Sequence, residues 1–161
     1  MDFKRLALFS GGALVALALW LAWFCQPERQ VRRHTAVLLK AVERRNWEKV
    51  KNLMADGYGD HWQHDKAFLA EALPQVFGQF LFLNIEHETT GVEVQGGAGN
   101  TVTRVKMSGS GGPLAQIVIE KVNNLSEPFI FHWSQRSGWP WDWELTRVDH
   151  PSLDPGGMQR L

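Results

Sequence analysis

Cysteine and tyrosine are almost absent from this chain of 161 residues, which contains one of each. With Cys25 as its only cysteine, the chain cannot form an internal disulfide, so cysteine usage does not indicate a redox compartment. Phosphate-binding glycine loops before a helix, serine or cysteine nucleophile motifs, zinc-knuckle spacings and internal repeats are also missing. No motif therefore assigns a reaction, and no cofactor is expected.

Net charge is also absent, because 17 basic side chains balance 17 acidic ones. The balance is uneven: residues 28–51 are strongly basic, and the chain from residue 52 onward is acidic. A lysine or arginine near an anionic membrane contributes about 1 kcal/mol to binding. We therefore expect anionic lipid headgroups at Arg29, Arg32 and Arg33, and no nucleic acid partner. A solvated helix face explains the same charges equally well.

The longest uncharged run, Leu6–Cys25, is predicted to be an uncleaved transmembrane helix. As a helix rising about 1.5 Å per residue it would reach roughly 30 Å, the thickness of the hydrocarbon core. Lys4 and Arg5 precede the run, and tryptophans gather at its far end, as in an interfacial aromatic belt. A small-x-small cleavage pair occurs only in its middle, which argues against removal as a signal peptide. We expect a single-pass membrane protein.

The charges flanking this run leave the side of the membrane open. More basic residues follow it than precede it, which places the domain in the cytoplasm by the positive-inside rule. A basic pair before an apolar stretch is, however, the layout of an exported signal anchor, and long domains can cross regardless of charge. The second consideration favours the non-cytoplasmic side.

The remaining sequence predicts one folded domain. Residues 1–26 form the anchor, residues 27–150 the domain, and residues 151–161, rich in proline and glycine, a flexible tail. A domain of this size can bury enough surface to fold without a metal or a disulfide.

Helical spacing of apolar residues predicts three helices after the anchor. The first begins after Pro27, and Asn46 and Asp65 are suited to cap the second and third. Pro74 lies inside the third helix and should kink or divide it.

From Leu81 onward, apolar and polar residues alternate, and stretches rich in glycine, asparagine and proline separate the runs. This pattern predicts a meander of antiparallel strands with one buried face. The expected strands are residues 82–95, 101–108, 114–122, 129–135 and 142–149.

Helices followed by antiparallel strands indicate an α+β fold, in which about three helices pack on a curved antiparallel sheet of four to six strands. The chain resembles the nuclear-transport-factor-like superfamily, a cone-shaped, cystatin-like fold that includes ketosteroid isomerases. The resemblance covers Val31 to Pro151 and is carried by Leu38–Glu48, Leu53-Met54, Tyr58-Gly59-Asp60, Ser137-Gly138-Trp139 and Trp143-Glu144-Leu145.

The resemblance implies a pocket at the wide end of the cone. Enzymatic members place a tyrosine, or an aspartate with a histidine, inside that pocket. Here the first helix has no tyrosine, and the single one, Tyr58, follows the second helix. The catalytic sets of the superfamily therefore do not transfer directly.

Three residues are catalytic candidates: His87, Asp60 and Tyr58. His87 shares the parity of Leu83 and Ile85, which predicts a place on the core face, where a histidine could act as a base. A hydrogen-bonded core histidine is the commoner alternative. For Tyr58 and Asp60, the alternative is that they close the helical hairpin.

His61 and His64 are candidate metal ligands. Two histidines three residues apart could bind a metal if the stretch were helical and a third ligand approached. Because loop histidines more often serve as caps, no metal is predicted.

Aromatic residues concentrate in the last two expected strands. Trp133 and Trp143, with His132, could form an apolar wall of the pocket, and a purely structural core is the alternative.

Two functions remain open. The first is a membrane-anchored, non-catalytic domain that binds a small apolar ligand or a protein partner. The alternative is a membrane-tethered isomerase, dehydratase or hydrolase that uses a pocket histidine with an acidic residue. A homodimer formed through the sheet is a further possibility.

Overall fold

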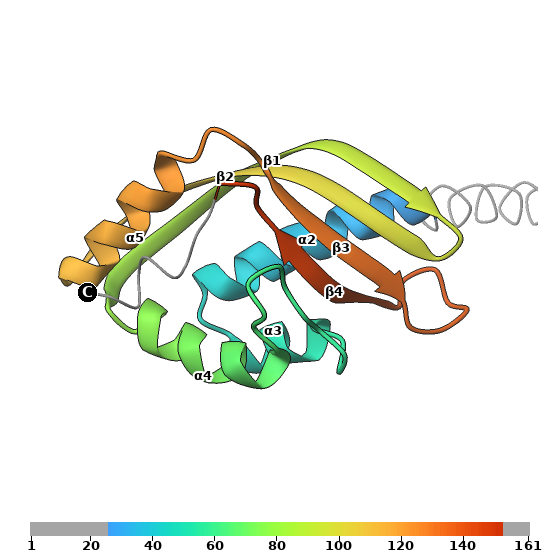
Figure 1. Ribbon diagram of the computed structural model, residues 1–161, viewed down its shortest axis with the longest axis horizontal. Coiled ribbons are helices and arrows are strands. Elements are labelled where there is room, and N and C mark those ends of the chain that lie inside the picture. The colour runs from blue at the N-terminus through green and yellow to red at the C-terminus, as the bar shows by residue number, and fades with distance from the viewer. Residues whose placement is uncertain (1–25, 153–161) are drawn as a thin grey trace, which may run out of the picture.

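The computed structural model describes residues 26–152, which fold into helices packed on one curved antiparallel sheet (Figure 1). The helices are α2 (Pro27–Glu43), α3 (Trp47–Leu53), α4 (Lys66–Phe77) and α5 (Pro113–Asn123), and the strands are β1 (Phe80–Gln95), β2 (Ala98–Gly111), β3 (Phe129–Gln135) and β4 (Trp143–Asp149). The predicted anchor, Leu6–Cys25, and residues 153–161 lie outside the described residues. Within residues 26–152, no helix combines the length and the apolar character needed to cross a bilayer.

The three helices expected before the sheet are confirmed, and local chemistry explains where they start. Pro27 occupies the first turn of α2, where a missing N–H costs nothing. The Asn46 side chain accepts the Lys49 N–H at 3.1 Å, and the Asp65 side chain accepts the Phe68 N–H at 2.7 Å. Pro74 does not divide α4, which is one helix from end to end.

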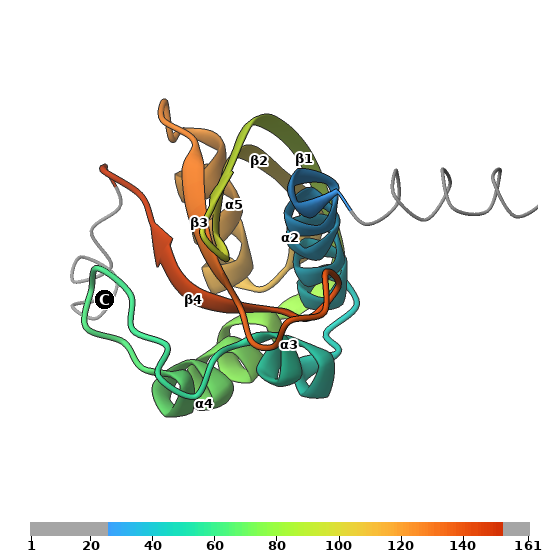
Figure 2. The same cartoon turned by 90° about the vertical axis from the view of Figure 1, so that its right-hand side faces the viewer.

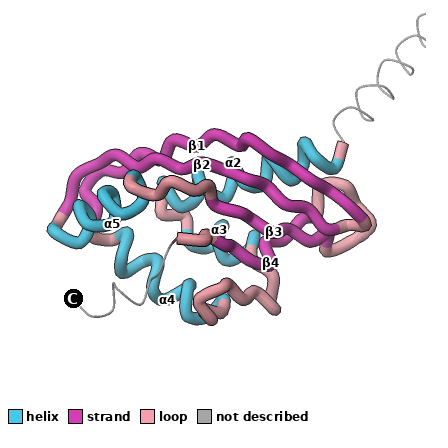
Figure 3. Tube along the Cα trace, turned by 45° about the horizontal axis from the view of Figure 1, so that its top comes forward, coloured by secondary structure: helices cyan, strands magenta, loops and turns pink. Residues whose placement is uncertain are grey.

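The sheet has the order β1-β2-β3-β4, and every neighbouring pair is antiparallel. Figure 3 shows β1 and β2 as one long hairpin that extends beyond the shorter β3 and β4. Gly96 and Gly97 form its turn with φ angles of 58° and 81°. Positive φ at both central residues is the requirement of a type I′ turn, which glycine meets without strain.

The third expected strand is wrong: residues 113–123 form the helix α5. The run of β-branched residues in this segment favoured a strand. Its buried positions, Ala115 and Val118, are three residues apart, and Ile119 and Val122 also pack on the core, which is helical spacing. Pro113 stands in the first turn, as is common for a helix start.

Side chains from α2 and from the turn that follows it pair with backbone groups along β1. Glu43 accepts the Ile85 N–H at 3.1 Å, Arg32 donates to the Thr89 carbonyl at 2.7 Å, and Arg45 donates to the Phe80 carbonyl. An uncovered edge strand would be free to pair with another chain. α2 therefore serves as a cover for this edge as well as a core helix.

The core between α2 and the sheet has a polar centre. Thr35, Thr101 and Trp133 are at most 1% exposed. The Thr35 hydroxyl lies 2.8 Å from the Thr101 hydroxyl and accepts the indole N–H of Trp133 at 3.0 Å. This network joins α2 to β2 and β3 and fixes how the helix lies on the sheet.

Gly109 is required by a close approach between β1 and β2. A Cβ added there would lie 2.2 Å from the Phe82 carbonyl oxygen, next to the register shift between Phe80 and Phe82. Gly109→Ala should therefore lower the free energy of unfolding by about 1–3 kcal/mol, as overpacking does. Gly138→Ala is the control, because a Cβ added at Gly138 would meet nothing within 4 Å. Equal denaturation midpoints for the two variants would contradict the close approach.

Candidate ligand pocket

An apolar pocket of about 210 Å³ lies between the helical layer and the end of the sheet formed by β3 and β4. Figure 2 shows α3 and α4 beneath the curved sheet, with α2 along its inner side. The apolar lining comes from α2 (Leu38, Leu39, Val42), α3 (Val50, Met54), α4 (Leu69, Leu73), β3 (Phe131) and β4 (Leu145, Val148).

α4 forms one wall of this pocket. The helix is rich in apolar residues, yet none of them is buried. Leu69 and Leu73, one helical turn apart, are half-buried and border the pocket. Leu69, Leu73, Val76 and Phe77 pack against the core from the outside. Of these, Leu69 and Leu73 also line the pocket, so this part of the apolar face of α4 is shared between the core and the pocket.

The loop after α3 supplies the polar part of the lining, which consists of Tyr58, Asp60 and Trp62. Asp60 is almost fully buried, with a side chain 3% exposed. One carboxylate oxygen accepts the backbone N–H groups of Trp62 at 2.9 Å and His64 at 2.8 Å. The other lies 3.1 Å from the Nδ1 atom of His64. Asp60 therefore shapes this loop and also places a negative charge at the pocket.

Tyr58 is 4% exposed and hydrogen-bonds with the backbone of Val148. Burial raises the pKa of its phenol well above the ordinary value, and the negative charge of Asp60 raises it further. The pocket therefore holds a neutral phenol beside a carboxylate.

The raised pKa of Tyr58 predicts a loss of stability in alkali. The unfolded chain releases this proton near pH 10, whereas the folded chain holds it to higher pH. The stabilisation is fully present below about pH 10 and is lost as the pH rises through the pKa of the folded state. Because Tyr58 is the only tyrosine, tyrosinate absorbance reports this group alone. Titration near pH 10 in the folded chain, as in a guanidinium-denatured control, would contradict its burial.

Of the three catalytic candidates, the structure brings Tyr58 and Asp60 together at the pocket and leaves His87 apart. His87 lies on the expected face, opposite Val105 of β2, but it is exposed and is not part of the core. Alternation predicts which face a strand residue points to but not how far the core extends. No residue of β1 after Ile85 is buried.

The two metal-ligand candidates do not converge. Residues 60–64 are a loop rather than a helix, and His61 is exposed. His64 is engaged by Asp60 and stacks on Phe68 with ring centroids 4.4 Å apart. Among residues 26–152, no three histidine, cysteine, aspartate or glutamate side chains form a group that could hold a metal.

The aromatic candidates lie outside the lining of the apolar pocket. Trp133 and Trp143 are core residues, 1% and 4% exposed. His132 is half-buried, with its ring nitrogens 2.8 Å from the Asn100 side chain and 3.0 Å from Asp149. The apolar wall predicted from these residues is instead built by leucine, valine and methionine, with Phe131 as its phenylalanine.

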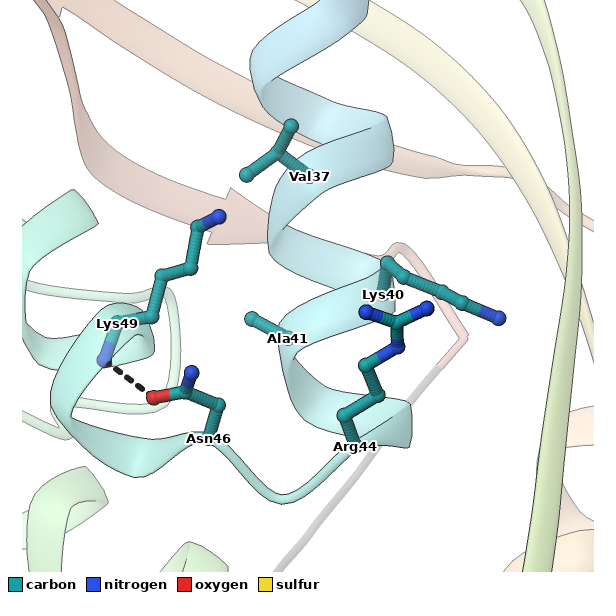
Figure 4. Close-up of a pocket in the computed structure, with 6 residues that line it drawn as sticks. All are labelled: Val37, Lys40, Ala41, Arg44, Asn46 and Lys49. Carbon is teal, nitrogen blue, oxygen red and sulfur yellow. Dashed lines mark hydrogen bonds between the residues drawn. The ribbon is translucent and has the colours of Figure 1, made fainter.

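A smaller basic pocket of about 140 Å³ lies at the corner between α2 and α3 (Figure 4). Figure 4 shows the amino groups of Lys40 and Lys49 pointing to opposite sides of it. Lys40 is ion-paired with Glu43, and the Asn46 side chain is engaged in capping α3. These charges do not converge on one point, so the apolar pocket is the better candidate site.

No protein-family model matches the chain, and no curated protein sequence matches it. Solved structures do match. An NTF2-like protein of unknown function from Pseudomonas putida has a TM-score of 0.55 and 13% identity, with 75% of this chain and 82% of that chain covered. A suggested dehydratase of the NTF2-like family from Streptomyces avermitilis has a TM-score of 0.55 and 13% identity, with 76% and 93% covered.

The described domain has the nuclear-transport-factor-like fold. The resemblance inferred from the sequence is thus confirmed at the level of the fold. The structure of Bdellovibrio bacteriovorus Bd1075 is also similar, with a TM-score of 0.57 and 9% identity over 75% of this chain. This chain spans only 38% of the length of that protein. At these identities the likeness establishes the architecture, and function must be argued from the site.

Proposed function

We propose that this protein is a membrane-anchored, non-catalytic domain that binds a small apolar ligand in the pocket beneath β3 and β4. The observation that carries the proposal is the apolar lining of this pocket, to which Leu69 and Leu73 of α4 contribute while remaining only half-buried against the core. Ligand sites are typically concave and mostly apolar, with a few polar groups that orient the ligand. Tyr58 and Asp60 would be those groups.

The polar groups of the pocket favour binding over catalysis. A general base needs a lone pair free to take a proton from the substrate. Asp60 already makes three contacts within the loop that it organises, so only part of its acceptor capacity is left for a substrate. Tyr58 holds its proton more tightly than an ordinary tyrosine. Both groups are therefore better suited to orient a bound molecule than to accept a proton from it.

Membrane anchoring is the second part of the proposal, and the sequence of residues 6–25 supports it. This run is uncharged and ends just before Gln26, which precedes α2. Arg29 and Arg33 lie in the first turns of α2 and are exposed, which suits contact with anionic headgroups. Arg32, the third predicted lipid contact, also supports β1 through the Thr89 carbonyl.

A dye-binding experiment tests the ligand pocket. The apolar dye phenylnaphthylamine should bind the full chain, and bound dye should slow amide hydrogen exchange in α4. Leu73→Trp fills the pocket and should abolish both effects. Gln75→Trp, at an exposed position of the same helix, should leave them intact. Equal binding by the two variants would show that the dye lies elsewhere and would reject this pocket.

One observation favours an enzyme as the second candidate: Asp60 and His64 lie 3.1 Å apart beside Tyr58. The pair would supply a histidine and an acid, and the similar Streptomyces avermitilis protein is a suggested dehydratase. If the chain turned over a ligand with an acidic proton beside a carbonyl group, His64→Gln should abolish turnover and leave dye binding unchanged. Turnover that survives this substitution would remove His64 from the mechanism.

A further inference from the structure

Two exposed tryptophans form a stacked pair on the loop between β3 and β4. Trp139 is 62% exposed and Trp141 is 49% exposed. Their ring centroids lie 5.0 Å apart with an interplanar angle of 23°. Tryptophan normally buries its large apolar surface. Two adjacent exposed rings therefore indicate an interaction surface for a protein or a membrane.

The loop that presents this pair is held in one conformation by hydrogen bonds. The Trp139 carbonyl accepts the Gln135 side chain at 2.7 Å and the Asp142 N–H at 3.2 Å. The Pro140 carbonyl accepts the indole N–H of Trp143 at 2.8 Å. Since Trp143 is a core residue, the loop is tied directly to the folded body. The two rings are therefore displayed by a rigid support.

The tryptophan pair lies at the same end of the domain as the start of α2. Figures 1 and 2 both show the β3–β4 loop near the first turn of α2. Contacts agree with the views: a Cβ on Gly99 would meet Val31 of α2 at 2.7 Å and the ring of Trp143 at 3.3 Å.

Charge and chemistry at this end fit a lipid surface. Arg29 and Arg33 are exposed on the first turns of α2. Tryptophan is the residue that accumulates at membrane interfaces, because its apolar ring and polar N–H suit the headgroup region. Arginine adds attraction to anionic lipids.

We propose that Trp139 and Trp141 insert into the headgroup layer of the membrane that holds residues 6–25, and that they orient the domain on it. This inference rests on the proposed membrane anchoring. One point of attachment to the membrane does not determine which side of the domain faces the lipid, whereas a second contact does. The pocket entrance would then have a defined position relative to the bilayer.

The test places a fluorophore beside the tryptophan pair in the full chain. Cys25→Ala removes the only native cysteine, and Gly138→Cys introduces a new one where nothing lies within 4 Å of the added Cβ. Leu81→Cys, at a position 86% exposed on β1, is the matched control. Each variant carries a nitrobenzoxadiazole label and is reconstituted in vesicles of equal parts phosphatidylglycerol and phosphatidylcholine, with iodide on both sides.

We expect the label at position 138 to show a blue-shifted emission and protection from iodide, and the label at position 81 to show neither. Adding Trp139→Ala and Trp141→Ala should remove the blue shift and the protection at position 138. If the protein floats with the vesicles but the two labels behave alike, the lipid contact is overturned and the anchor stands. A protein partner would then be the occupant of the tryptophan pair. Failure of the chain to float with vesicles would overturn both the anchor and this contact.

Discussion

Replacing Thr35 by valine is expected to lower the free energy of unfolding by about 2–5 kcal/mol, since each buried polar group left without a partner costs about 1–3 kcal/mol. Valine keeps the shape of threonine but cannot accept the indole N–H of Trp133 or pair with the Thr101 hydroxyl. All three side chains are inaccessible to water, so no solvent molecule can replace the lost partner. Chemical denaturation monitored by tryptophan fluorescence would measure the loss.

Two comparisons make this prediction specific to the buried network. Thr90→Val removes an exposed hydroxyl on β1, which bonds the Val102 carbonyl at 3.3 Å, and should change stability by less than about 0.5 kcal/mol. Thr35→Val combined with Thr101→Val should cost less than the sum of the single changes, because one hydrogen bond is removed in both. Strictly additive losses would show that the two hydroxyls do not interact.

The pocket is expected to prefer a cationic ligand over an anionic one. Asp60 is the only charged residue in the described lining of the apolar pocket, and its side chain is 3% exposed. An alkylamine should therefore displace phenylnaphthylamine at roughly tenfold lower concentration than a carboxylate of equal chain length, a difference of about 1.4 kcal/mol. Competition titrations with the full chain measure this ratio.

Asp60→Asn should abolish the preference for the amine. The amide keeps an oxygen that can accept the Trp62 and His64 N–H groups, so the loop is retained while the charge is lost. Asp56→Asn is the matched control, because Asp56 is fully exposed and pairs with Lys66 outside the apolar pocket. A preference that survives in Asp60→Asn, or that is absent from the native chain, would remove Asp60 from ligand recognition.

Local chemistry made much of the fold predictable. Asn46 and Asp65 have side chains that cap helices, and each does so in the structure. Gly96 and Gly97 mark the hairpin turn because no other residue type adopts two successive positive φ angles as readily. These features depend on neighbouring residues alone, which is why the sequence is enough to find them.

Features that depend on long-range packing were harder to predict. α5 contains many strand-forming residues, whose β propensity favours a strand, yet packing against β2 makes the segment a helix. There, the Asn123 side chain pairs with both backbone groups of Met107, at 2.8 Å to the N–H and 2.7 Å to the carbonyl. The Asn123 amide thus takes the place of a neighbouring strand, and no sequence pattern predicts such a pairing.

The candidate site was predictable only in part. Tyr58 could be predicted as a site residue because it is the only tyrosine, and Asp60 because it is an acidic residue in the loop after α3. The leucines and valines of the lining were missed, because an apolar residue at helical spacing looks the same whether it faces a core or a pocket. The signal available in the sequence was the apolar character of α4. Leu69, Leu73 and Val76 give this short helix a wide apolar face, although none of its residues is fully buried.

Methyl NMR spectra of the full chain, recorded with and without phenylnaphthylamine, test the proposed ligand pocket most directly. We predict that the methyl resonances of Leu73, Leu145 and Val148 shift on addition of the dye, because these side chains surround the pocket. The methyls of Leu81 and Leu114, which are exposed elsewhere on the domain, should stay in place. Shifts confined to Leu81 and Leu114 would contradict a binding site beneath β3 and β4.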